Sequence, residues 1–252
     1  MKPDTGAAGL SPRQLARIAG ALYLINVVLG AFAIGFVHGR LFTSDPATTA
    51  ANIQAHELLY RASLAAHVVV TVTNVPLALI FYELFKVVNR RVALLAAFFI
   101  LVATAIEAAD LLAQFVPLVL LGDGADTSIL SPAQLEALSL TSRLWDADYA
   151  LFTVFFGLDI LCLSYLVLRS RFVPRAFAIL LAVDGIAYLV YSFTHFLAPE
   201  LAASLTPWIQ FPAPVAEGGL SLWLLIVGVN VEARTRDASG GAPMRTLEPD
   251  RA

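Results

Sequence analysis

The stretch that decides the fold is residues 92–121, VALLAAFFILVATAIEAADLLAQFVPLVLL, whose only charged side chains are Glu107 and Asp110. A helix needs about 20 mainly apolar residues to cross the roughly 30 Å hydrocarbon core of a bilayer, so this run is long enough to span a membrane. The whole chain of 252 residues is 59% hydrophobic and only 14% charged, too few charges to cover a soluble surface of this size. We therefore expect a protein whose main partner is the lipid bilayer and which binds no nucleic acid.

The same length test finds five further runs along the chain. The predicted spans are residues 18–37, 62–82, 92–121, 144–168, 176–198 and 214–231. The last span is the shortest, and Trp208 and Trp223 support it as aromatic anchors at the membrane interface. The expected fold class is all-α, a polytopic membrane bundle of six transmembrane helices.

Positive charge is sorted between the loops, and this sorting predicts the orientation. Of the 16 Lys and Arg residues, only Arg40, Arg61 and Arg143 fall on one side of the six spans, and the other thirteen fall on the opposite side. Because positive residues are retained in the cytoplasm, both termini are predicted to be cytoplasmic, N-in and C-in, in a bacterial inner (plasma) membrane. The tails, residues 1–17 and 232–252, are poor in bulky apolar residues and are expected to be disordered.

Ionisable side chains inside apolar runs are costly, so they are the first candidates for a functional site. By their depth in the spans, the candidates for a polar cavity open to the outer face are His67, Glu107, Asp110, His195 and Glu217. Glu107 and Asp110 lie three residues apart, on one helical face, where two carboxylates repel each other. We expect this pair to share a proton or to pair with a cation such as His67, His195 or Arg143. A purely structural ion pair would give the same pattern.

Two imidazoles and two carboxylates also suit a metal ion. His67, His195, Glu107 and Asp110 form a candidate set for zinc or iron with an open position for water, although no H-E-x-x-H or E-x-x-H motif occurs. A haem held by the two histidines is a further alternative, and the sequence names no cofactor. Glu217 has a simpler interpretation, because it follows Pro214 at a helix N-terminus, where a carboxylate complements the macrodipole.

Short motifs across nearly the whole chain resemble one family. They are Arg17 to Leu24 with the pattern R-I-A-G-x-x-Y-L, Asp45 to Ile53 with Thr48, Thr49 and Asn52, Arg61, Phe156-Gly157-Leu158, Tyr165-Leu166, Ser170 and Pro174. The family is a bacterial family of six-helix integral membrane proteins that is catalogued only as a domain of unknown function. The resemblance implies a six-helix fold and no activity. Many members are expected to have a histidine near position 159, where this chain has Asp159.

Three functions follow as hypotheses. The first is a membrane protein that binds or conducts a small ligand or a proton through an outward-facing polar cavity. The second is an intramembrane metal-dependent hydrolase that uses His67 and His195 with Glu107 or Asp110. The third is a scaffold without a ligand site, which forms a homo-oligomer or holds another membrane protein through its glycine-bearing faces. The sequence leaves open whether the protein is an enzyme.

Overall fold

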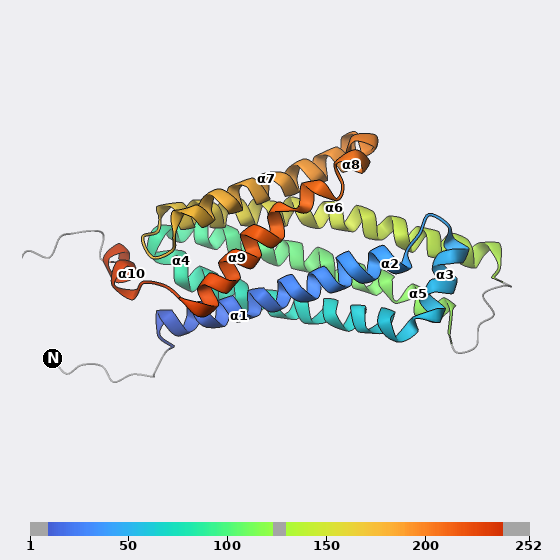
Figure 1. The fold of residues 1–252 in the computed structure, drawn as a ribbon, viewed down its shortest axis with the longest axis horizontal. Coiled ribbons are helices and arrows are strands. Elements are labelled where there is room, and N and C mark those ends of the chain that lie inside the picture. Colours follow the sequence, from blue (N-terminus) through green and yellow to red (C-terminus); the bar gives the residue numbers. More distant parts are fainter. Residues whose placement is uncertain (1–9, 123–129, 239–252) are drawn as a thin grey trace, which may run out of the picture.

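The structure is a computed structural model that describes residues 10–122 and 130–238, and every regular element in that part of the chain is a helix (Figure 1). Five helical segments there are long and apolar enough to cross a membrane. They are Pro12–Leu41, Glu57–Leu120, Pro132–Arg169, Arg175–Leu197 and Trp208–Ile226. The predicted all-α class is confirmed for the described residues. The predicted spans 18–37, 62–82 and 144–168 lie within these segments, and 92–121 and 176–198 run one residue beyond them. The predicted span 214–231 is five residues too long, because its helix ends at Ile226 and the chain leaves the helical conformation at Gly228, with φ 77°.

The longest helix, α4 (Glu57–Gln114), contains two antiparallel arms. Its backbone leaves the helical conformation at Asn89, with φ −156° and ψ 103°. The Asn89 side-chain oxygen accepts hydrogen bonds from the backbone N–H groups of Arg91 and Val92, as an N-cap residue does at the start of a new helix. The predicted spans 62–82 and 92–121 therefore lie on the two arms, and α5 (Val116–Leu120) continues the second one.

Helix α1 (Pro12–Gly30) begins with a capping box between Ser11 and Gln14. It continues through the π-helix η1 (Ala31–His38) and the short α2 (Gly39–Leu41). Helix α3 (Pro46–Ala55) follows, and its N-cap, Asp45, accepts a hydrogen bond of 2.9 Å from the backbone N–H of Thr48. The hydroxyl and N–H of Thr48 lower the pKa of Asp45 below its usual value.

The second half of the chain forms α6 (Pro132–Arg169) and α7 (Arg175–Leu197), which pack against each other along their length. Helix α8 (Pro199–Leu205) and the 3₁₀-helix η3 (Trp208–Gln210) lead into α9 (Pro212–Ile226), which packs on α1. The last described element is α10 (Val231–Ala238).

Both predicted tails are partly helical. Helix α1 includes residues 12–17 because the capping box starts it there, and α10 lies almost wholly within the predicted tail 232–252. Arg234 fixes α10 to the bundle by donating hydrogen bonds to the carbonyl oxygens of Glu83 and Leu84, at 2.7 Å and 3.2 Å. Residues 1–9 and 239–252, the remainder of the two predicted tails, lie outside the described residues.

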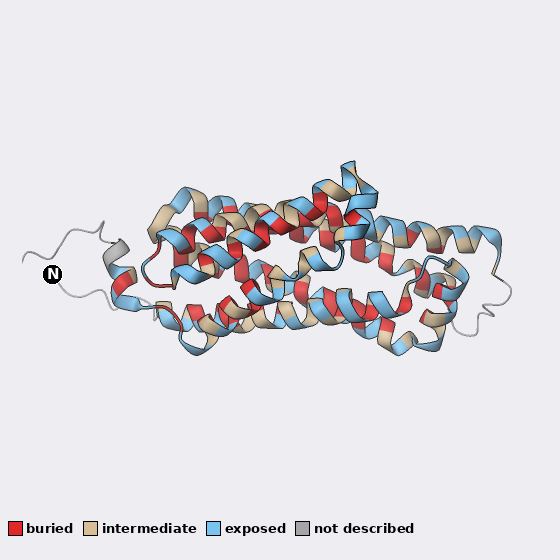
Figure 2. Ribbon diagram, turned by 45° about the horizontal axis from the view of Figure 1, so that its top comes forward, coloured by how far each residue is buried: buried red, intermediate tan, exposed pale blue. Residues whose placement is uncertain are grey.

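The outer surface of the bundle is apolar. Figure 2 shows exposed residues along the outward faces of the helices and buried residues toward the interior. Many of the exposed residues are large and hydrophobic, with Leu58, Val119 and Leu197 each at least 80% exposed. A soluble protein rarely exposes apolar patches of this extent, whereas lipid solvates them. Two buried apolar clusters fill the interior, one around Leu84 and Leu220 and the other around Leu41, Ile53 and Tyr60.

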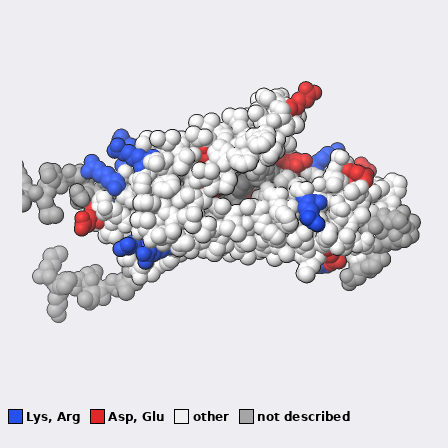
Figure 3. Space-filling model, viewed as in Figure 1, with Lys and Arg blue, Asp and Glu red and all other residues white. Residues whose placement is uncertain are grey.

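Lys and Arg side chains gather at one end of the bundle, where α1 begins and α10 lies, and the middle of the face in Figure 3 is almost free of charge. We call this the basic end. Four parts of the chain meet there, namely the start of α1, the reversal at Asn89, the α6–α7 loop and α10. Arg17 donates a hydrogen bond of 3.4 Å to the carbonyl oxygen of Ile226. The backbone N–H of Asn230 donates a hydrogen bond of 3.4 Å to the carbonyl oxygen of Phe172.

Candidate functional site

A cavity of about 280 Å³ lies inside the bundle, between α1, η1, both arms of α4, α6, α7 and α9. Its wall is mainly aliphatic and aromatic. The aromatic residues are Tyr23, Phe81, Tyr82, Phe85, Tyr149, Phe152, Phe156 and Tyr188. A concave, mainly apolar space with a few polar groups is the usual form of a small-molecule site.

The polar part of the wall is acidic. Three carboxyl groups line the cavity, those of Glu107 on α4, Asp159 on α6 and Glu217 on α9, together with Asn26, Asn74 and Gln210. Among the described residues that line it there is no Lys, Arg or His. The wall therefore offers oxygen acceptors and negative charge but no positive side chain.

Glu217 is held by two tyrosines from different helices. The Tyr23 hydroxyl on α1 donates to its Oε2 at 2.8 Å, and the Tyr188 hydroxyl on α7 donates to its Oε1 at 2.9 Å. The hydrogen bond from Tyr23 is possible because α1 approaches α9 closely. This close approach depends on Gly20, one turn before Tyr23. A Cβ atom at Gly20 would lie only 2.7 Å from the carbonyl oxygen of Ser221, one turn after Glu217.

A second carboxyl group adjoins Glu217. The side chain of Asp184, on α7, is buried close to the Glu217 carboxyl group, and its Oδ2 has no hydrogen-bond partner within the described structure. Two ionised carboxylates at such a position repel each other, so a shared proton or a cation stabilises them. The Asp184–Glu217 pair is therefore a candidate proton-holding group beside the cavity.

Asp159 reaches the cavity from α6 without a partner. Its side chain is half-buried, and no hydrogen bond or ion pair joins it to another described residue. Aromatic rings line the same cavity: Phe156, one turn before Asp159 on α6, meets Tyr188 edge-to-face at 5.2 Å between ring centroids and stacks on Phe152 at 5.2 Å. Asp159 is thus a carboxyl group in a cavity with aromatic walls.

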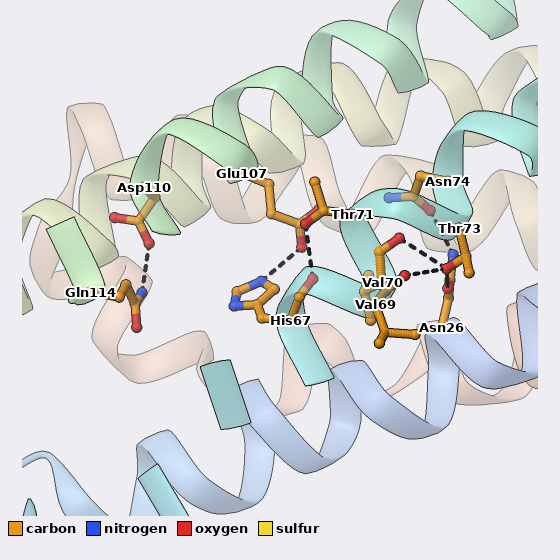
Figure 4. Close-up of polar contacts among 10 residues, drawn as sticks. All are labelled: Asn26, His67, Val69, Val70, Thr71, Thr73, Asn74, Glu107, Asp110 and Gln114. Atoms are coloured by element: carbon orange, nitrogen blue, oxygen red, sulfur yellow. Dashed lines mark hydrogen bonds and ion pairs between the residues drawn. The ribbon is translucent and has the colours of Figure 1, made fainter. Parts of the chain in front are cut away.

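His67 and Glu107 form the third polar group and connect the two arms of α4 (Figure 4). His67 Nε2 lies 2.8 Å from Glu107 Oε1, with the residues 7% and 6% exposed. The other Glu107 oxygen, Oε2, is buried without a partner in the described part of the chain. Glu107 lines the main cavity, whereas His67 lines a separate space of about 10 Å³, roughly the size of one water, near His38 and Trp145.

The structure distributes the sequence-predicted residues over separate groups. Asp110 is buried and accepts a hydrogen bond of 2.6 Å from the amide of Gln114 on its own helix, and Figure 4 shows this contact beside the separate His67–Glu107 contact. His195 is half-buried beside Tyr191, with Asp146 as its charged neighbour, and it does not join His67. No group of three or more His, Cys, Asp or Glu side chains suitable for a metal ion occurs in residues 10–122 and 130–238.

Sequence reasoning did not select four residues of the site, namely Asp159, Asp184, Tyr23 and Tyr188. The two aspartates carried the same signal as Glu107, an acid within an apolar run, but they lie at another depth than the predicted outer cluster. Tyr23 belongs to the R-I-A-G-x-x-Y-L motif of the family resemblance, but that motif implies no role for it, and Tyr188 had no signal, since a tyrosine in a span is ordinarily a packing residue.

Comparison with known proteins identifies a family. The model of the family described as Domain of unknown function (DUF4386) matches residues 18–228, which confirms the resemblance seen in the sequence. No curated protein and no solved structure matches the chain.

Proposed function

We propose that this chain, which belongs to the DUF4386 family, is a multi-pass membrane protein that binds a small, mainly apolar molecule inside its helical bundle. The observation that carries the proposal is the cavity of about 280 Å³, with an apolar and aromatic wall and three carboxyl groups from α4, α6 and α9. Sites of this kind hold a ligand by its apolar surface and orient it with a few polar groups.

The proposal includes six spans, with the two arms of α4 counted separately, and both termini in the cytoplasm of a bacterium. The reversal at Asn89 supports the count, because it turns one 64-residue segment into two antiparallel crossings. The basic end supports the orientation, since Lys and Arg are retained on the cytoplasmic side.

Other hypotheses have less support. The metal-dependent hydrolase requires His67 and His195 to meet, and they lie in different groups, His67 with Glu107 and His195 near Asp146. The scaffold hypothesis has less support because it requires no cavity and so leaves the observed cavity without a role. The predicted ligand path is a polar cavity lined by His67, Glu107, Asp110, His195 and Glu217. The cavity described above is mainly apolar, and of these five residues Glu107 and Glu217 line it.

A filled cavity tests the proposal. Gly30 lines the cavity, and a Cβ atom there would meet no atom within 4 Å, so Gly30→Leu extends an apolar side chain into free space. Gly39 has equally free surroundings but lies outside the cavity, which makes Gly39→Leu the matched control. The probe is neopentylbenzene, a small neutral hydrocarbon, added to the detergent-purified protein.

A ligand that binds the folded state raises the melting temperature in proportion to RT ln(1 + [L]/Kd). We expect neopentylbenzene to raise the melting temperature of the wild-type protein and of Gly39→Leu, and to lose most of this effect in Gly30→Leu. An equal rise in Gly30→Leu would show that the probe binds outside the cavity. No rise in the wild-type protein with neopentylbenzene or with its cationic isostere, benzyltrimethylammonium, would show that the cavity is not a binding site.

A further inference from the structure

We infer that the ligand of the cavity is a lipophilic organic cation, with its charge against Asp159 and Glu217 and its apolar part against the aromatic wall. The inference rests on the proposed function, because it takes the cavity to be a binding site and adds the chemical class of the ligand. The groups that carry it are the cavity carboxyl groups, their partners and the neighbouring rings.

Charge is the first reason. The cavity wall contains the carboxyl groups of Glu107, Asp159 and Glu217 and no basic side chain among the described residues. Burying an ionised carboxylate in an apolar medium without a counter-charge is costly, so each group needs a proton or a cation. His67 supplies a partner for one oxygen of Glu107 only, and Asp159 has no partner in the described structure.

An unused acceptor is the second reason. The Oε2 atom of Glu107 is buried, belongs to a residue that lines the cavity, and accepts no hydrogen bond from any described group. Buried polar atoms are nearly always satisfied, so an unsatisfied one beside an open space indicates a missing partner. In a space without basic side chains, a bound cation or hydrogen-bond donor is the partner that fits.

The aromatic wall is the third reason. Rings attract cations through their negative faces. The eight aromatic residues of the wall include Phe152, Phe156 and Tyr188, whose rings contact one another. An anion would meet three carboxyl groups and no positive partner. A neutral ligand would use the apolar wall but leave the carboxyl groups unpaired.

A proton and the cation compete for the same carboxyl groups. The titratable groups around Glu217 are Tyr23 on α1, Tyr149 and Asp159 on α6, and Asp184 and Tyr188 on α7. On α4, Glu107 lines the same cavity, and His67 is bonded to Glu107. A cation that binds these carboxylates displaces protons from them, so its affinity should rise with pH while that of a neutral molecule should not.

Two probes of the same shape separate charge from shape. Benzyltrimethylammonium is a cation, and neopentylbenzene is its carbon isostere without charge. Their affinities are measured on the detergent-purified full chain from the rise of the melting temperature, with free probe concentrations fixed by equilibrium dialysis. We expect the cation to bind at least about tenfold more tightly than the isostere, the ratio that one charge-assisted contact of about 1.5 kcal/mol gives.

Asp159→Asn removes the charge and keeps the shape, and Glu136→Gln, at an exposed site on α6, is the matched control. We expect Asp159→Asn to weaken the affinity for the cation about tenfold and to leave the affinity for the isostere unchanged. Neither affinity should change in Glu136→Gln.

If Asp159→Asn does not fold, Glu217→Gln serves instead, because its amide oxygen still accepts a hydrogen bond from one tyrosine hydroxyl. Equal affinities of the two probes overturn the cation and leave the cavity as a neutral site. Failure of both probes overturns the proposed function itself. Cation selectivity that is unchanged in Asp159→Asn, or in Glu217→Gln where that variant replaces it, overturns the assignment of Asp159 and Glu217.

Discussion

His67 and Glu107 come from opposite arms of α4, 40 residues apart, and their side chains meet at 2.8 Å in the bundle interior. A second bond, from the Tyr60 hydroxyl to the carbonyl oxygen of Gln114 at 2.6 Å, joins the same arms nearer the α3 end of the bundle. Both contacts exist because the chain reverses at Asn89. The His67–Glu107 pair therefore fixes the register of the two arms and places Glu107 at the cavity wall.

Truncation of His67 should strongly destabilise the protein. His67→Ala leaves a buried carboxyl group with both oxygens unpaired, and removal of one partner of a buried pair costs about 3 to 5 kcal/mol. The free energy of unfolding is measured by titration of mixed micelles with SDS. The matched control is Glu57→Ala, which breaks the accessible Glu57–Arg61 pair of 2.6 Å and should cost less than about 1 kcal/mol. Similar losses in the two variants would show that the buried pair has no special role.

The sequence could predict that His67, Glu107 and Asp110 are candidates, because each is an ionisable residue within an apolar run. It named His67 as one of three possible cations for the Glu107–Asp110 pair but could not select it from the three. Glu107 meets His67 only through the reversal at Asn89, whereas Asp110 bonds Gln114, four residues away on its own helix, a spacing that the sequence does contain. His195 lies at a depth similar to that of His67, but depth does not define the direction of a side chain around its helix, and its charged neighbour is Asp146.

Much of the fold follows from local signals. Run length and hydropathy locate the long apolar helices, and the basic residues Lys86, Arg90 and Arg91 mark the reversal inside α4. The cavity does not follow from such signals, because it is the space left between side chains of five helices and η1. The Asp184–Glu217 contact likewise depends on how α7 and α9 pack, which no periodicity records.

Gly20 should tolerate no side chain. A Cβ atom there would collide with the backbone of Leu225 and lie 2.7 Å from the carbonyl oxygen of Ser221, and backbone cannot move aside cheaply. We expect Gly20→Ala to destabilise the protein by about 1 to 3 kcal/mol, the usual cost of overpacking. Gly30→Ala on the same helix should be neutral or stabilising, since its Cβ meets nothing within 4 Å and alanine favours helix. A thermal melt of both variants checks this, and unchanged stability in Gly20→Ala would contradict the close α1–α9 contact.

Cysteine labelling tests the six-span topology. The chain has one cysteine, Cys162, so Cys162→Ala gives a background for single cysteines at the exposed positions Ala55, Arg90 and Glu136. In intact cells, a membrane-impermeant maleimide should label Ala55→Cys and Glu136→Cys, whereas Arg90→Cys should react only after the membrane is permeabilised. If Arg90→Cys is labelled in intact cells while the other two positions are not, the orientation is the opposite of the proposed one. Identical accessibility of all three positions would mean that the arms of α4 do not cross the membrane separately.

Arg234 should stabilise the bundle through two carbonyl groups near the reversal of α4. Its Nη2 and Nε atoms donate to the carbonyl oxygens of Glu83 and Leu84, and partial burial lowers the pKa of its guanidinium. Arg234→Ala should cost about 1.5 to 3 kcal/mol, the value of hydrogen bonds from a charged group. Arg234→Lys should recover only part of this loss, because an ammonium lacks the planar fork that reaches two acceptors in fixed geometry.

The matched control for Arg234 is Arg91→Ala, an exposed position at the same end of the bundle, which should change the free energy of unfolding by less than about 0.5 kcal/mol. Limited proteolysis adds a local measurement, because loss of the Arg234 contacts should release α10 from α4 and expose its backbone to protease before the bundle unfolds. If Arg234→Ala and Arg91→Ala have the same stability and the same cleavage rate at α10, then α10 is not held by Arg234.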